Sequence, residues 1–511
     1  MFPIDSFTRI ARYVPDRIAV VDEGRKLTYG HLAAHADALG AAFQELGGAP
    51  RLKVAVLCPN SIDLFAAMIA IHGCGAVLIP LNPRNSASEL NAQVALVEPD
   101  VLVVDSSCHG MIDPGRAAVV LAGTDTHSGQ ITLEELAGQY AGRSPMWPAV
   151  SIEDDYAIKF TGGSSGRPKG VRQSFRAHVA VIIQVLLGLH WSDGEVFVCA
   201  TPLTHAAGSF VLPTLAVGGK VIIAHGSKPE SLLDTMERTG ATATWIPPTV
   251  LYSLIDEQKA RARTLSLRHL VFGGAPTTPE RIDEGIQVFG PVLETTYGQT
   301  EASTIVTALH SAQMAADKNA RYSAGLCGPL VRIAIMGPDG KLVSQGSSGE
   351  IVVQGALMMS GYLGMEEETA KTLVGGWLHT GDIGYIDNSG LLFVKDRIRD
   401  VVISGGFNVY PSDVEAALAK HPAVRECVVF GIPDPHWGER VECALELKPN
   451  AHVRPGELVE FAKTLVGSIK APKRVHILQQ LPRSSVGKVL RREAKSQVEA
   501  KYQAAAQEQQ G

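Results

Sequence analysis

Short apolar runs alternate with longer helical patterns along much of this 511-residue chain, and no other feature limits its fold as strongly. Runs rich in β-branched residues occur at 53–57, 76–79, 196–199, 221–223, 242–245 and 270–272, and helical patterns at 31–46, 62–71, 229–238 and 248–258. Because these strands are apolar throughout, we expect parallel sheets that are covered on both faces. The alternation therefore predicts an α/β fold with two stacked α/β units.

The pattern changes near residue 349 to short strands and turns, including a hairpin around Asn388-Ser389-Gly390. From about residue 400 a smaller unit begins, with a helix at 412–420 for which Ser412 is the expected N-cap. Strands at 424–431 and 441–447 and a helix at 455–466 complete it. We therefore expect a large N-terminal domain at 1–398, which includes a β-rich module, and a small mobile α+β C-terminal domain at 399–511.

The segment from Thr161 to Gly170 reads TGGSSGRPKG and follows an apolar, β-prone run at 156–160. Its four glycines allow backbone N–H groups to turn inward, three hydroxyls add donors, and Lys169 adds a positive charge. This composition predicts a cradle for a phosphate chain.

Two other motifs compete for the same loop. A Walker loop needs Lys directly after its last Gly, whereas here Pro168 precedes Lys169 and Gly170 follows it. The segment Gly162 to Gly166 formally matches the G-x-S-x-G nucleophile elbow of serine hydrolases, which would make Ser164 the nucleophile. An elbow must lead into a helix, and Pro168 and Gly170 disfavour one. A serine acyl hydrolase remains the minority hypothesis.

Composition excludes several classes of protein. The net charge of −6 disfavours a general nucleic-acid binder. The seven cysteines are scattered without a C-x-x-C pair, which is typical of a reduced compartment without disulfides or a zinc site. The first residues lack an apolar signal segment, and the apolar run at 179–189 is too short to cross a bilayer. We expect a cytoplasmic protein without integral membrane association, and the sequence leaves a homodimer open.

Several further clusters carry polar groups at strand ends and turns. They are Tyr297-Gly298-Gln299-Thr300-Glu301, Thr380-Gly381-Asp382, the charged run at 396–400, the Gly-rich segment at 404–408, and the segment at 482–488 that ends in Lys488. Each alone is typical of a strand-end turn or of a solvated charge run. Their function is therefore indicated only by their combination.

In this order and at these separations the clusters resemble the adenylate-forming superfamily of acyl-CoA synthetases, peptide-synthetase adenylation domains and luciferases. The resemblance covers nearly the whole chain. The sequence around Phe407 and Lys488 looks most like that of fatty acyl-CoA ligases. The chain departs from the family's pattern at Gly162 and Ser165 in the loop, and at Arg399, where the hinge is usually Asp or Lys.

The resemblance implies that a carboxylate attacks the α-phosphate of ATP and forms an acyl-adenylate and pyrophosphate. Thr300 and Glu301 would hold Mg²⁺, Lys488 would bridge the carboxylate and the α-phosphate, and His205 would gate the carboxylate. The implied ATP-binding residues are Thr161, Gly162, Gly163, Ser164, Ser165, Gly166 and Lys169 at the phosphates, Gly274, Ala275, Pro276, Thr296 and Tyr297 at the adenine, and Asp382 and Arg397 at the ribose.

In the implied second step the C-terminal domain turns about Arg399 and CoA takes the acyl group. Glycines at 405 and 406 would let the pantetheine arm pass close to the backbone. The implied CoA-binding residues are Ser404, Gly405, Gly406 and Trp437.

The implied acid pocket is His205, Ala206, Ala207, Trp245, Gly273, Gly298, Ser303 and Thr304. Most of these residues are small and Trp245 is the one large apolar wall, which suggests a medium-chain fatty, alicyclic or aromatic acid. The pocket positions offer no acidic anchor for an α-amino group, so amino acids are disfavoured. A ligase that loads a carrier protein shares every motif of the first half-reaction and remains the alternative.

Overall fold

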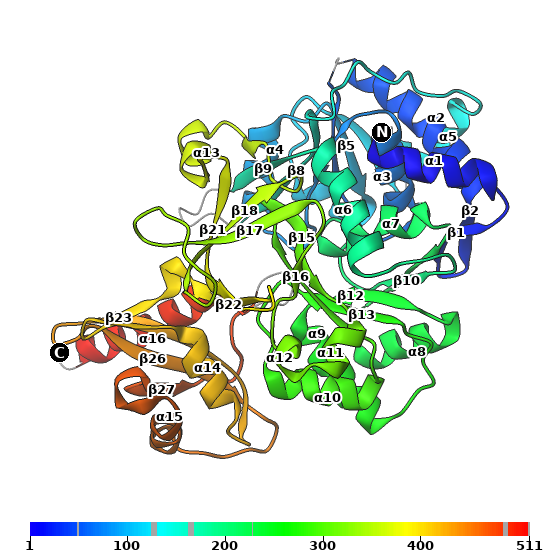
Figure 1. The fold of residues 1–511 in the computed structure, drawn as a ribbon. Helices are drawn as coiled ribbons and strands as arrows, with labels where there is room; N and C mark the ends of the chain where they lie inside the picture. Colours follow the sequence, from blue (N-terminus) through cyan, green and yellow to red (C-terminus); the bar gives the residue numbers. More distant parts are fainter. Residues whose placement is uncertain (49–50, 124–129, 162–167, 227, 484–488, 509–511) are drawn as a thin grey trace. The chain divides into compact units, whose positions relative to one another are not determined.

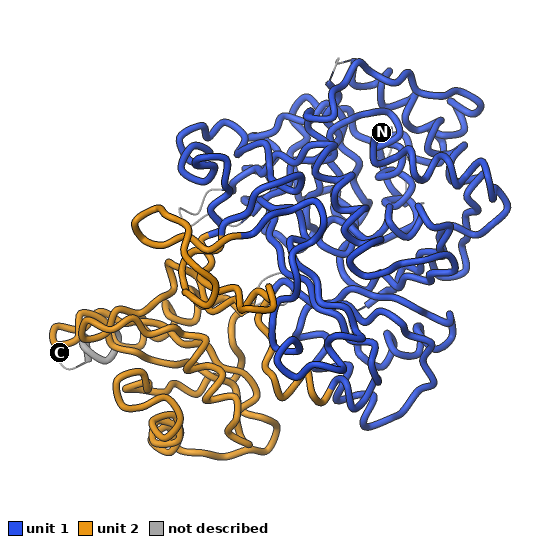
Figure 2. Tube along the Cα trace, in the orientation of Figure 1, with its two compact units in different colours: residues 1–274, 285–333, 352–380 blue, residues 275–284, 334–351, 381–511 orange. Residues whose placement is uncertain are grey.

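The structure is a computed structural model that describes residues 1–48, 51–123, 130–161, 168–226, 228–483 and 489–508 (Figure 1). The chain forms two compact units (Figure 2). Unit 1 contains residues 1–274, 285–333 and 352–380, and unit 2 contains residues 275–284, 334–351 and 381–511. Residues 381–398 thus belong with the C-terminal residues, and a domain boundary at 398/399 stays a prediction.

The first sheet of unit 1 has eight strands in the order β19-β9-β8-β4-β3-β5-β6-β7. They are β3 (Lys53–Leu57), β4 (Val77–Pro80), β5 (Val101–Asp105), β6 (Ala118–Ala122), β7 (Ile131–Thr132), β8 (Asp155–Thr161), β9 (Lys169–Ser174) and β19 (Gly361–Tyr362). Strands β8, β4, β3, β5, β6 and β7 run parallel, whereas β9 is antiparallel to both β8 and β19. Residues of β3 and β4 are almost all buried, as the apolar runs at 53–57 and 76–79 predicted, and so are most residues of β5.

The second sheet of unit 1 has nine strands in the order β16-β15-β14-β13-β12-β10-β11-β1-β2. They are β1 (Ile18–Asp22), β2 (Arg25–Thr28), β10 (Val196–Cys199), β11 (Lys220–Ile223), β12 (Ala243–Ile246), β13 (His269–Gly273), β14 (Leu293–Gln299), β15 (Ala302–Leu309) and β16 (Leu326–Cys327). Strands β1 and β10 to β14 pair in parallel. The predicted pair of α/β units in the N-terminal part is therefore confirmed.

Helices α3 (Ile62–Gly73) and α6 (Phe175–Gly188) lie between the two sheets. Helix α3 contacts β4 of one sheet and β1 of the other, and α6 contacts β9 and β15. Each begins where a serine side chain, Ser61 or Ser174, accepts a hydrogen bond from the backbone N–H three residues later. Because both faces of these helices are covered, most of their residues are buried.

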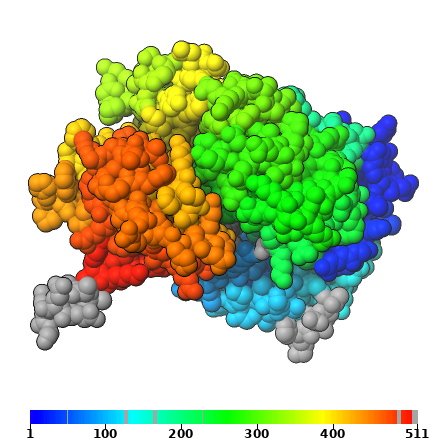
Figure 3. Space-filling view, turned by 90° about the horizontal axis from the view of Figure 1, so that it is seen from below, coloured from blue at the N-terminus to red at the C-terminus, as the bar shows by residue number. Residues whose placement is uncertain are grey.

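The remaining helices of unit 1 cover the outer faces of the sheets or connect strands (Figure 1). They include α1 (Pro3–Tyr13), α2 (Tyr29–Gly47), α4 (Ala87–Val97), α5 (Leu133–Gln139), α7 (Val211–Ala216), α8 (Pro229–Thr239), α9 (Pro248–Ala260), α11 (Ser311–Ala316), α12 (Lys318–Arg321) and α13 (Glu366–Thr372), while α10 (Pro279–Phe289) crosses from unit 2 into unit 1. In Figure 3 the segment that carries α8, α9 and α11, shown in green, forms one continuous surface.

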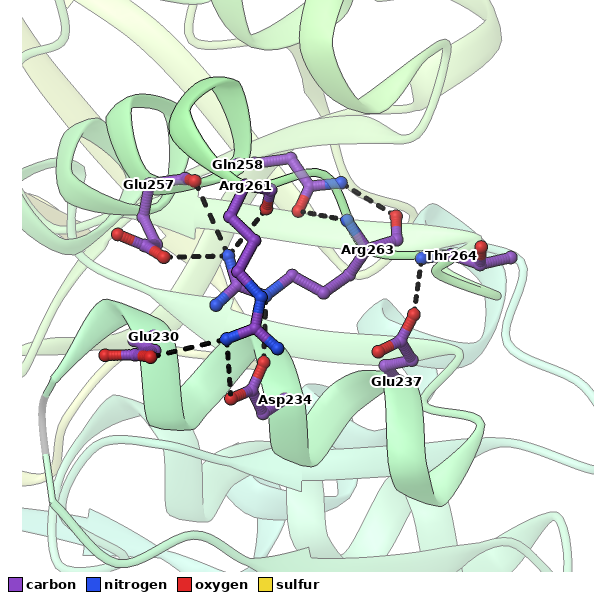
Figure 4. A network of polar contacts seen from close by, with 8 residues as sticks. All are labelled: Glu230, Asp234, Glu237, Glu257, Gln258, Arg261, Arg263 and Thr264. Carbon is purple, nitrogen blue, oxygen red and sulfur yellow. Dashed lines mark hydrogen bonds and ion pairs between the residues drawn. The ribbon is translucent and has the colours of Figure 1, made fainter.

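Arg263, in the segment after α9, forms ion pairs that connect this segment to α8 and α9 (Figure 4). Its buried guanidinium pairs with Asp234 at 2.9 Å and with Glu257 at 2.8 Å. The Gln258 side chain donates to the Arg263 carbonyl and accepts from its N–H. The network fixes the local backbone, and Nη2 of Arg263 is left without a hydrogen-bond partner in the described part of the chain.

A third sheet has the strand order β17-β18-β21-β20, and β22 pairs with β21. Its strands are β17 (Val331–Met336), β18 (Gly349–Gly355), β20 (Leu373–Val374), β21 (Trp377–Ile386) and β22 (Leu392–Arg397). Strands β21 and β22 form the predicted hairpin around Asn388-Ser389-Gly390. The β-rich module is therefore present.

The C-terminal part of unit 2 is an α+β fold with the sheet order β24-β23-β26-β25 and with β27 on β26. Its elements are β23 (Val402–Ser404), β24 (Phe407–Val409), α14 (Pro411–Ala419), β25 (Val424–Asp434), β26 (Gly438–Leu447), α15 (Pro455–Lys470), β27 (Arg474–Ile477) and α16 (Arg491–Glu508). Ser412 is not the N-cap of α14, so that prediction was wrong. The helix begins one residue earlier at Pro411, which suits the first helical position, and the Ser412 N–H donates to Asp396 at 2.8 Å.

His269 is held between two fully buried glutamates, Glu195 and Glu294, at the amino ends of β10, β13 and β14. Its Nδ1 lies 3.1 Å from Glu294 and its Nε2 lies 3.5 Å from Glu195, which also pairs with Arg268. Burial alone would lower the pKa of His269, but the two carboxylates outweigh it and raise the pKa to about 9.

Because this pKa is raised above its unfolded value, the stabilisation is complete below about pH 6.5 and is lost as pH rises through about 9. We expect the free energy of unfolding to fall by at most about 3 kcal/mol across that window. Denaturant unfolding of the wild type and of His269→Gln at several pH values measures it. If the free energy of unfolding changed with pH in the same way in both proteins between about pH 6.5 and about 9, the raised pKa would not belong to His269.

Candidate active site

The glycine loop connects two antiparallel strands rather than a strand and a helix. Thr161 at the end of β8 pairs with Lys169 at the start of β9, and helix α6 begins only at Phe175. Gly162, Gly163, Ser164, Ser165 and Gly166 lie outside the described residues. The flanking strands do not provide the strand–turn–helix frame of a nucleophile elbow, which argues against the hydrolase.

Lys169 makes two contacts beside this loop. Its ammonium lies 3.0 Å from a carboxylate oxygen of Glu368 on α13 and 5.2 Å from the centre of the Tyr362 ring on β19. Sequence analysis identified neither partner, because both lie far from the loop along the chain. The Lys169 cation is thus held at the end of the loop by a carboxylate and an aromatic ring.

Thr300 and Glu301 form the tight turn between β14 and β15. The Thr300 carbonyl accepts a hydrogen bond of 2.8 Å from the Gln173 side chain of β9. The Tyr362 hydroxyl donates to Oε1 of Glu301 at 3.0 Å. Tyr362 therefore touches both Lys169 and Glu301, and it joins the cation of the loop to the carboxylate of the turn.

Glu368 would compete with a bound phosphate chain for the Lys169 ammonium, if Lys169 holds phosphate as the sequence predicts. Glu368→Gln should lower KM for MgATP about two- to fivefold with little change in kcat, as expected for loss of a partly exposed ion pair. Steady-state kinetics measures both constants, and Glu367→Gln on the same helix is the matched control. A rise in KM would mean instead that Glu368 holds Lys169 in its working position.

Three of the expected acid-pocket residues, Trp245, Gly273 and Gly298, lie at or near the carboxyl ends of the parallel strands β12, β13 and β14, where α/β sheets place their ligands. Trp245 is on β12, and a side chain at Gly274, just after β13, would come within 3.8 Å of its ring. A side chain at Gly273 would collide with the Thr296 carbonyl at 2.5 Å. These glycines keep the backbones of β13 and β14 close together beside the indole.

A second group of pocket residues surrounds the 3₁₀ turn at Ala206–Phe210. His205 precedes this turn, and its Nε2 lies 3.3 Å from the Asn82 amide after β4. The Ser209 hydroxyl contacts the Thr304 hydroxyl at 3.1 Å. Burial, followed by the nearby Lys159 and Arg84 cations, lowers the pKa of His205 below its ordinary value. His205 is therefore a neutral imidazole at neutral pH.

Buried polar atoms without partners gather among these residues. Within the described part of the chain, the Trp245 indole N–H, the Ser303 hydroxyl and the Thr201 and Thr204 hydroxyls make no hydrogen bond. Buried polar groups are normally paired, so such orphans need an explanation. A ligand that presents polar atoms to this region would satisfy them.

Sequence analysis missed Lys159, the one charge in the apolar run at 156–160. It lies on β8, two residues before Thr161, in the interior of the eight-stranded sheet. The signal was present, because a lysine on a central strand among buried residues is unusual.

In unit 2, Asp382 on β21 and Arg397 on β22 lie opposite each other, with Nε of Arg397 3.3 Å from Oδ1 of Asp382. The structure thus brings together the two residues expected at the ribose. Ala275 and Pro276 also belong to unit 2, whereas Gly274, Thr296 and Tyr297 belong to unit 1.

The residues expected at CoA gather on one turn of unit 2. The Gly405 N–H donates to the Trp437 carbonyl at 2.8 Å, and a side chain at Gly405 would approach the indole to 2.9 Å. Ser404 pairs with Gly438, and Gly406 has a left-handed backbone with φ of 80°. Trp437 is 38% exposed with the Lys473 ammonium 5.5 Å above its ring. An aromatic face beside glycine backbone suits a slender ligand.

Two of the expected residues, Arg399 and Lys488, do not belong to any of these groups. Arg399 is 58% exposed and lies 3.8 Å from Asp400 in a 3₁₀ turn, which is compatible with a hinge. Lys488 lies outside the described residues.

The structure tests the fit of a divalent cation at Thr300 and Glu301. Among the described residues, no cluster of three or more histidine, cysteine or acidic side chains could hold a metal ion. Mg²⁺ does not need such a cage when phosphate oxygens and waters complete its shell. Glu301, oriented through Oε1 by Tyr362, leaves Oε2 without a hydrogen-bond partner in the described chain. The residues therefore fit a magnesium ion that arrives with a nucleotide.

No helix in the described part of the chain combines the length and the apolar character that a membrane span needs.

Comparisons with known proteins agree with this geometry. Residues 7–363 match the model for AMP-binding enzymes, and residues 413–488 match the model for the C-terminal domain of these enzymes. A feruloyl-CoA synthase from an Amycolatopsis species is 33% identical over 95% of this chain and 97% of its own length. A medium/long-chain-fatty-acid–CoA ligase, FadD8 of Mycobacterium tuberculosis, is 31% identical over 91% of this chain and 84% of its own. The solved structure of the amide bond synthetase McbA from Marinactinospora thermotolerans superimposes with a TM-score of 0.87, at 28% identity, over 97% of this chain and 99% of that one.

Proposed function

This chain belongs to the family of AMP-binding enzymes, and from that premise we propose that it is an AMP-forming acid–CoA ligase. It would activate a carboxylic acid with MgATP and transfer the acyl group to CoA. The observation that carries the proposal is the Lys169–Tyr362–Glu301 cluster, in which one tyrosine contacts both the cation of the glycine loop and the carboxylate of the β14–β15 turn. A phosphate chain with its metal ion needs both charges side by side.

In the first step an oxygen of the substrate carboxylate attacks the α-phosphate, and the bond to pyrophosphate breaks. Lys169 and the loop from Thr161 would hold the β- and γ-phosphates, and Asp382 with Arg397 would hold the ribose. Gly274, Ala275, Pro276, Thr296 and Tyr297 would surround the adenine, and Lys488 would stabilise the charge that develops at the α-phosphate. Mg²⁺ held by Thr300 and Glu301 would neutralise phosphate charge when bound.

In the second step the CoA sulfur attacks the acyl carbonyl, and AMP leaves with the electrons of the acyl–phosphate bond. Ser404, Gly405, Gly406 and Trp437 would guide the pantetheine arm. We assign the hinge for this step to Arg399, with the mobile domain at 399–511. His205 would shield the carboxylate while the adenylate forms.

The acid would lie against Trp245, with Ala206, Ala207, Gly273 and Gly298 leaving room around it and with Ser303 and Thr304 supplying hydroxyls. This lining favours a medium-chain, alicyclic or aromatic acid. One of the matched relatives is named for an aromatic acid and another for fatty acids, which supports the same range.

We place the protein in the cytoplasm. All seven cysteines are free thiols, and five of them are buried. A reduced compartment keeps such thiols unpaired.

Incubation with MgATP, a panel of carboxylic acids and one acceptor tests the function. AMP and thioester that appear only when acid and CoA are both present would establish the ligase. If thioester forms only on a phosphopantetheinylated carrier protein, the acceptor is that carrier protein and not CoA. If amides form with added amines, the enzyme is an amide synthetase. Acid-independent ester cleavage that Ser164→Ala abolishes would favour the hydrolase. Absence of acid-dependent pyrophosphate release across the panel would overturn the proposal.

A further inference from the structure

Lys159 is a lysine in the interior of unit 1. It occupies β8, between β4 and β9 in the eight-stranded sheet, and pairs with Val171 of β9. Its neighbours on the strand, Tyr156 to Ile158, are buried, while Lys159 keeps partial contact with solvent. A charged side chain in the middle of a sheet that still reaches water indicates a solvent-connected space beside it.

Histidines from three other elements lie beside β8, which carries this lysine, or beside the end of its neighbour β4. The Tyr156 ring lies between His72 of α3, at 4.1 Å, and His178 of α6, at 3.7 Å. His205, just before the 3₁₀ turn that follows β10, lies 3.3 Å from the side chain of Asn82, which follows β4, the neighbour of β8 in the sheet. The Lys159 charge contributes to lowering the pKa of all three histidines, after burial as the larger cause. Its ammonium therefore lies within electrostatic reach of the histidine that faces the acid pocket.

Among the described residues, no acidic side chain compensates the charge of Lys159. In the described part of the chain its ammonium has neither an ion pair nor a hydrogen bond. Burial lowers the pKa of Lys159 to about 8, and no carboxylate acts to raise it. The histidines beside it are neutral at neutral pH, with the pKa of His72 lowered to about 3. The region therefore carries one unbalanced positive charge.

Two buried polar atoms beside Lys159 also lack partners among the described residues. They are Nδ1 of His72 and Nδ1 of His178, on residues that are 4% and 8% exposed. The hydroxyls of Thr201, Thr204 and Ser303 also lack hydrogen-bond partners in the described part of the chain. A polar ligand would satisfy several of them at once.

A cation that is largely removed from water and has no counter-charge beside it lowers the stability of the fold. An apolar residue at the same point of β8 would avoid this cost. The charge is therefore explained best by an anion that the protein itself does not supply.

We propose that the Lys159 ammonium recognises a second anionic group on the acid substrate, so that the preferred substrates are dicarboxylic acids. The inference rests on the proposed function, because it places the second carboxylate in the pocket of the same ligase. The second carboxylate extends past His205 toward Lys159, away from the carboxylate that reacts. The preferred substrate is then not any apolar carboxylic acid but an acid that carries a charged group at each end.

Matched pairs of acids test the inference. Adipate, suberate and isophthalate are each compared with their monomethyl esters, with acid-dependent pyrophosphate release as the readout. The wild type should prefer each diacid. In Lys159→Met the ratio of kcat/KM for diacid to that for ester should fall about 10- to 100-fold, as expected for loss of a charged hydrogen bond. Lys159→Arg should retain the preference, and Lys26→Met, at an exposed position on β2, is the matched control.

Thermal unfolding gives a second readout that does not need turnover. Lys159→Met should unfold at a higher temperature than the wild type, because it removes an unpaired interior charge. Suberate should raise the unfolding temperature of the wild type and not that of the variant. A folded variant that shows this loss supports the inference even if its turnover is low.

Three results would overturn the inference. A wild type that activates monoacids and esters but not diacids would leave the ligase standing and remove the role of Lys159. An increase in KM for ATP in Lys159→Met, with an unchanged preference among acids, would assign the lysine to a phosphate instead. Absence of pyrophosphate release with every acid would overturn the proposed function and this inference together.

Discussion

Lys488→Ala should slow acyl-adenylate formation by about 10²- to 10³-fold, the loss expected when one preorganised charge is removed from a transition state. The proposed role of Lys488 is to neutralise charge that grows as the carboxylate attacks the α-phosphate. Little of that charge is present in bound ATP, so KM for ATP should change less than kcat. Single-turnover release of pyrophosphate measures the step directly.

Two controls separate this role from a general defect. Lys495→Ala removes a lysine of α16 that lies 4.0 Å from Glu499, and it should adenylate at the wild-type rate. Acyl-adenylate supplied to Lys488→Ala should still react with CoA, because the lysine acts only in the first step. If Lys488→Ala formed acyl-adenylate at the normal rate, its assignment would be wrong.

The α/β core was predictable because its signal is local. Strands such as β3 and β4 are short apolar runs, and α3 and α6 follow serine caps, so hydrophobic pattern and capping agree. The two-residue strand β7 carries too little pattern to be recognised. The start of α14 was misplaced because Ser412 fits an N-cap by type, whereas tertiary contact with Asp396 uses its N–H instead.

The candidate site was predictable only where its residues share a segment. The glycine loop and the β14–β15 turn each form a continuous motif. Tyr362, which joins them, is 61 residues from Glu301 along the chain, and no spacing rule connects the two. Glu368 likewise reaches Lys169 from a helix of ordinary acidic composition.

Lys159 was overlooked for a different reason. A hydrophobic pattern averages over a strand, and one lysine among four apolar residues does not change the prediction of a buried strand. Whether Lys159 has a structural or a functional role depends on whether a carboxylate lies beside its ammonium, and only the fold shows this. A charge that interrupts a central strand therefore requires a search for its partner before the strand is treated as structural.

Glu301→Gln should have the second large effect, because it replaces the carboxylate proposed to bind Mg²⁺ with a neutral amide of the same shape. We expect the Mg²⁺ concentration for half-maximal adenylation to rise about 10- to 100-fold, by analogy with losses at metal sites. The Tyr362 hydroxyl can still donate to the amide oxygen, so the fold of the β14–β15 turn should be retained. Pyrophosphate release titrated with Mg²⁺ at fixed ATP measures the shift.

Tyr362→Phe is the matched variant, since it keeps the carboxylate and removes only the hydroxyl that orients it. Its effect should be smaller, about 10-fold at most in metal affinity, because a positioning partner is lost and not a ligand. Manganese, which binds nitrogen and oxygen ligands more tightly than magnesium, should restore part of the activity of Glu301→Gln. Glu301→Gln and Tyr362→Phe could instead lose activity equally, with neither magnesium nor manganese restoring it. Glu301 would then support the structure of the turn rather than bind the metal ion. The nucleotide and Thr300 would hold the ion in that case.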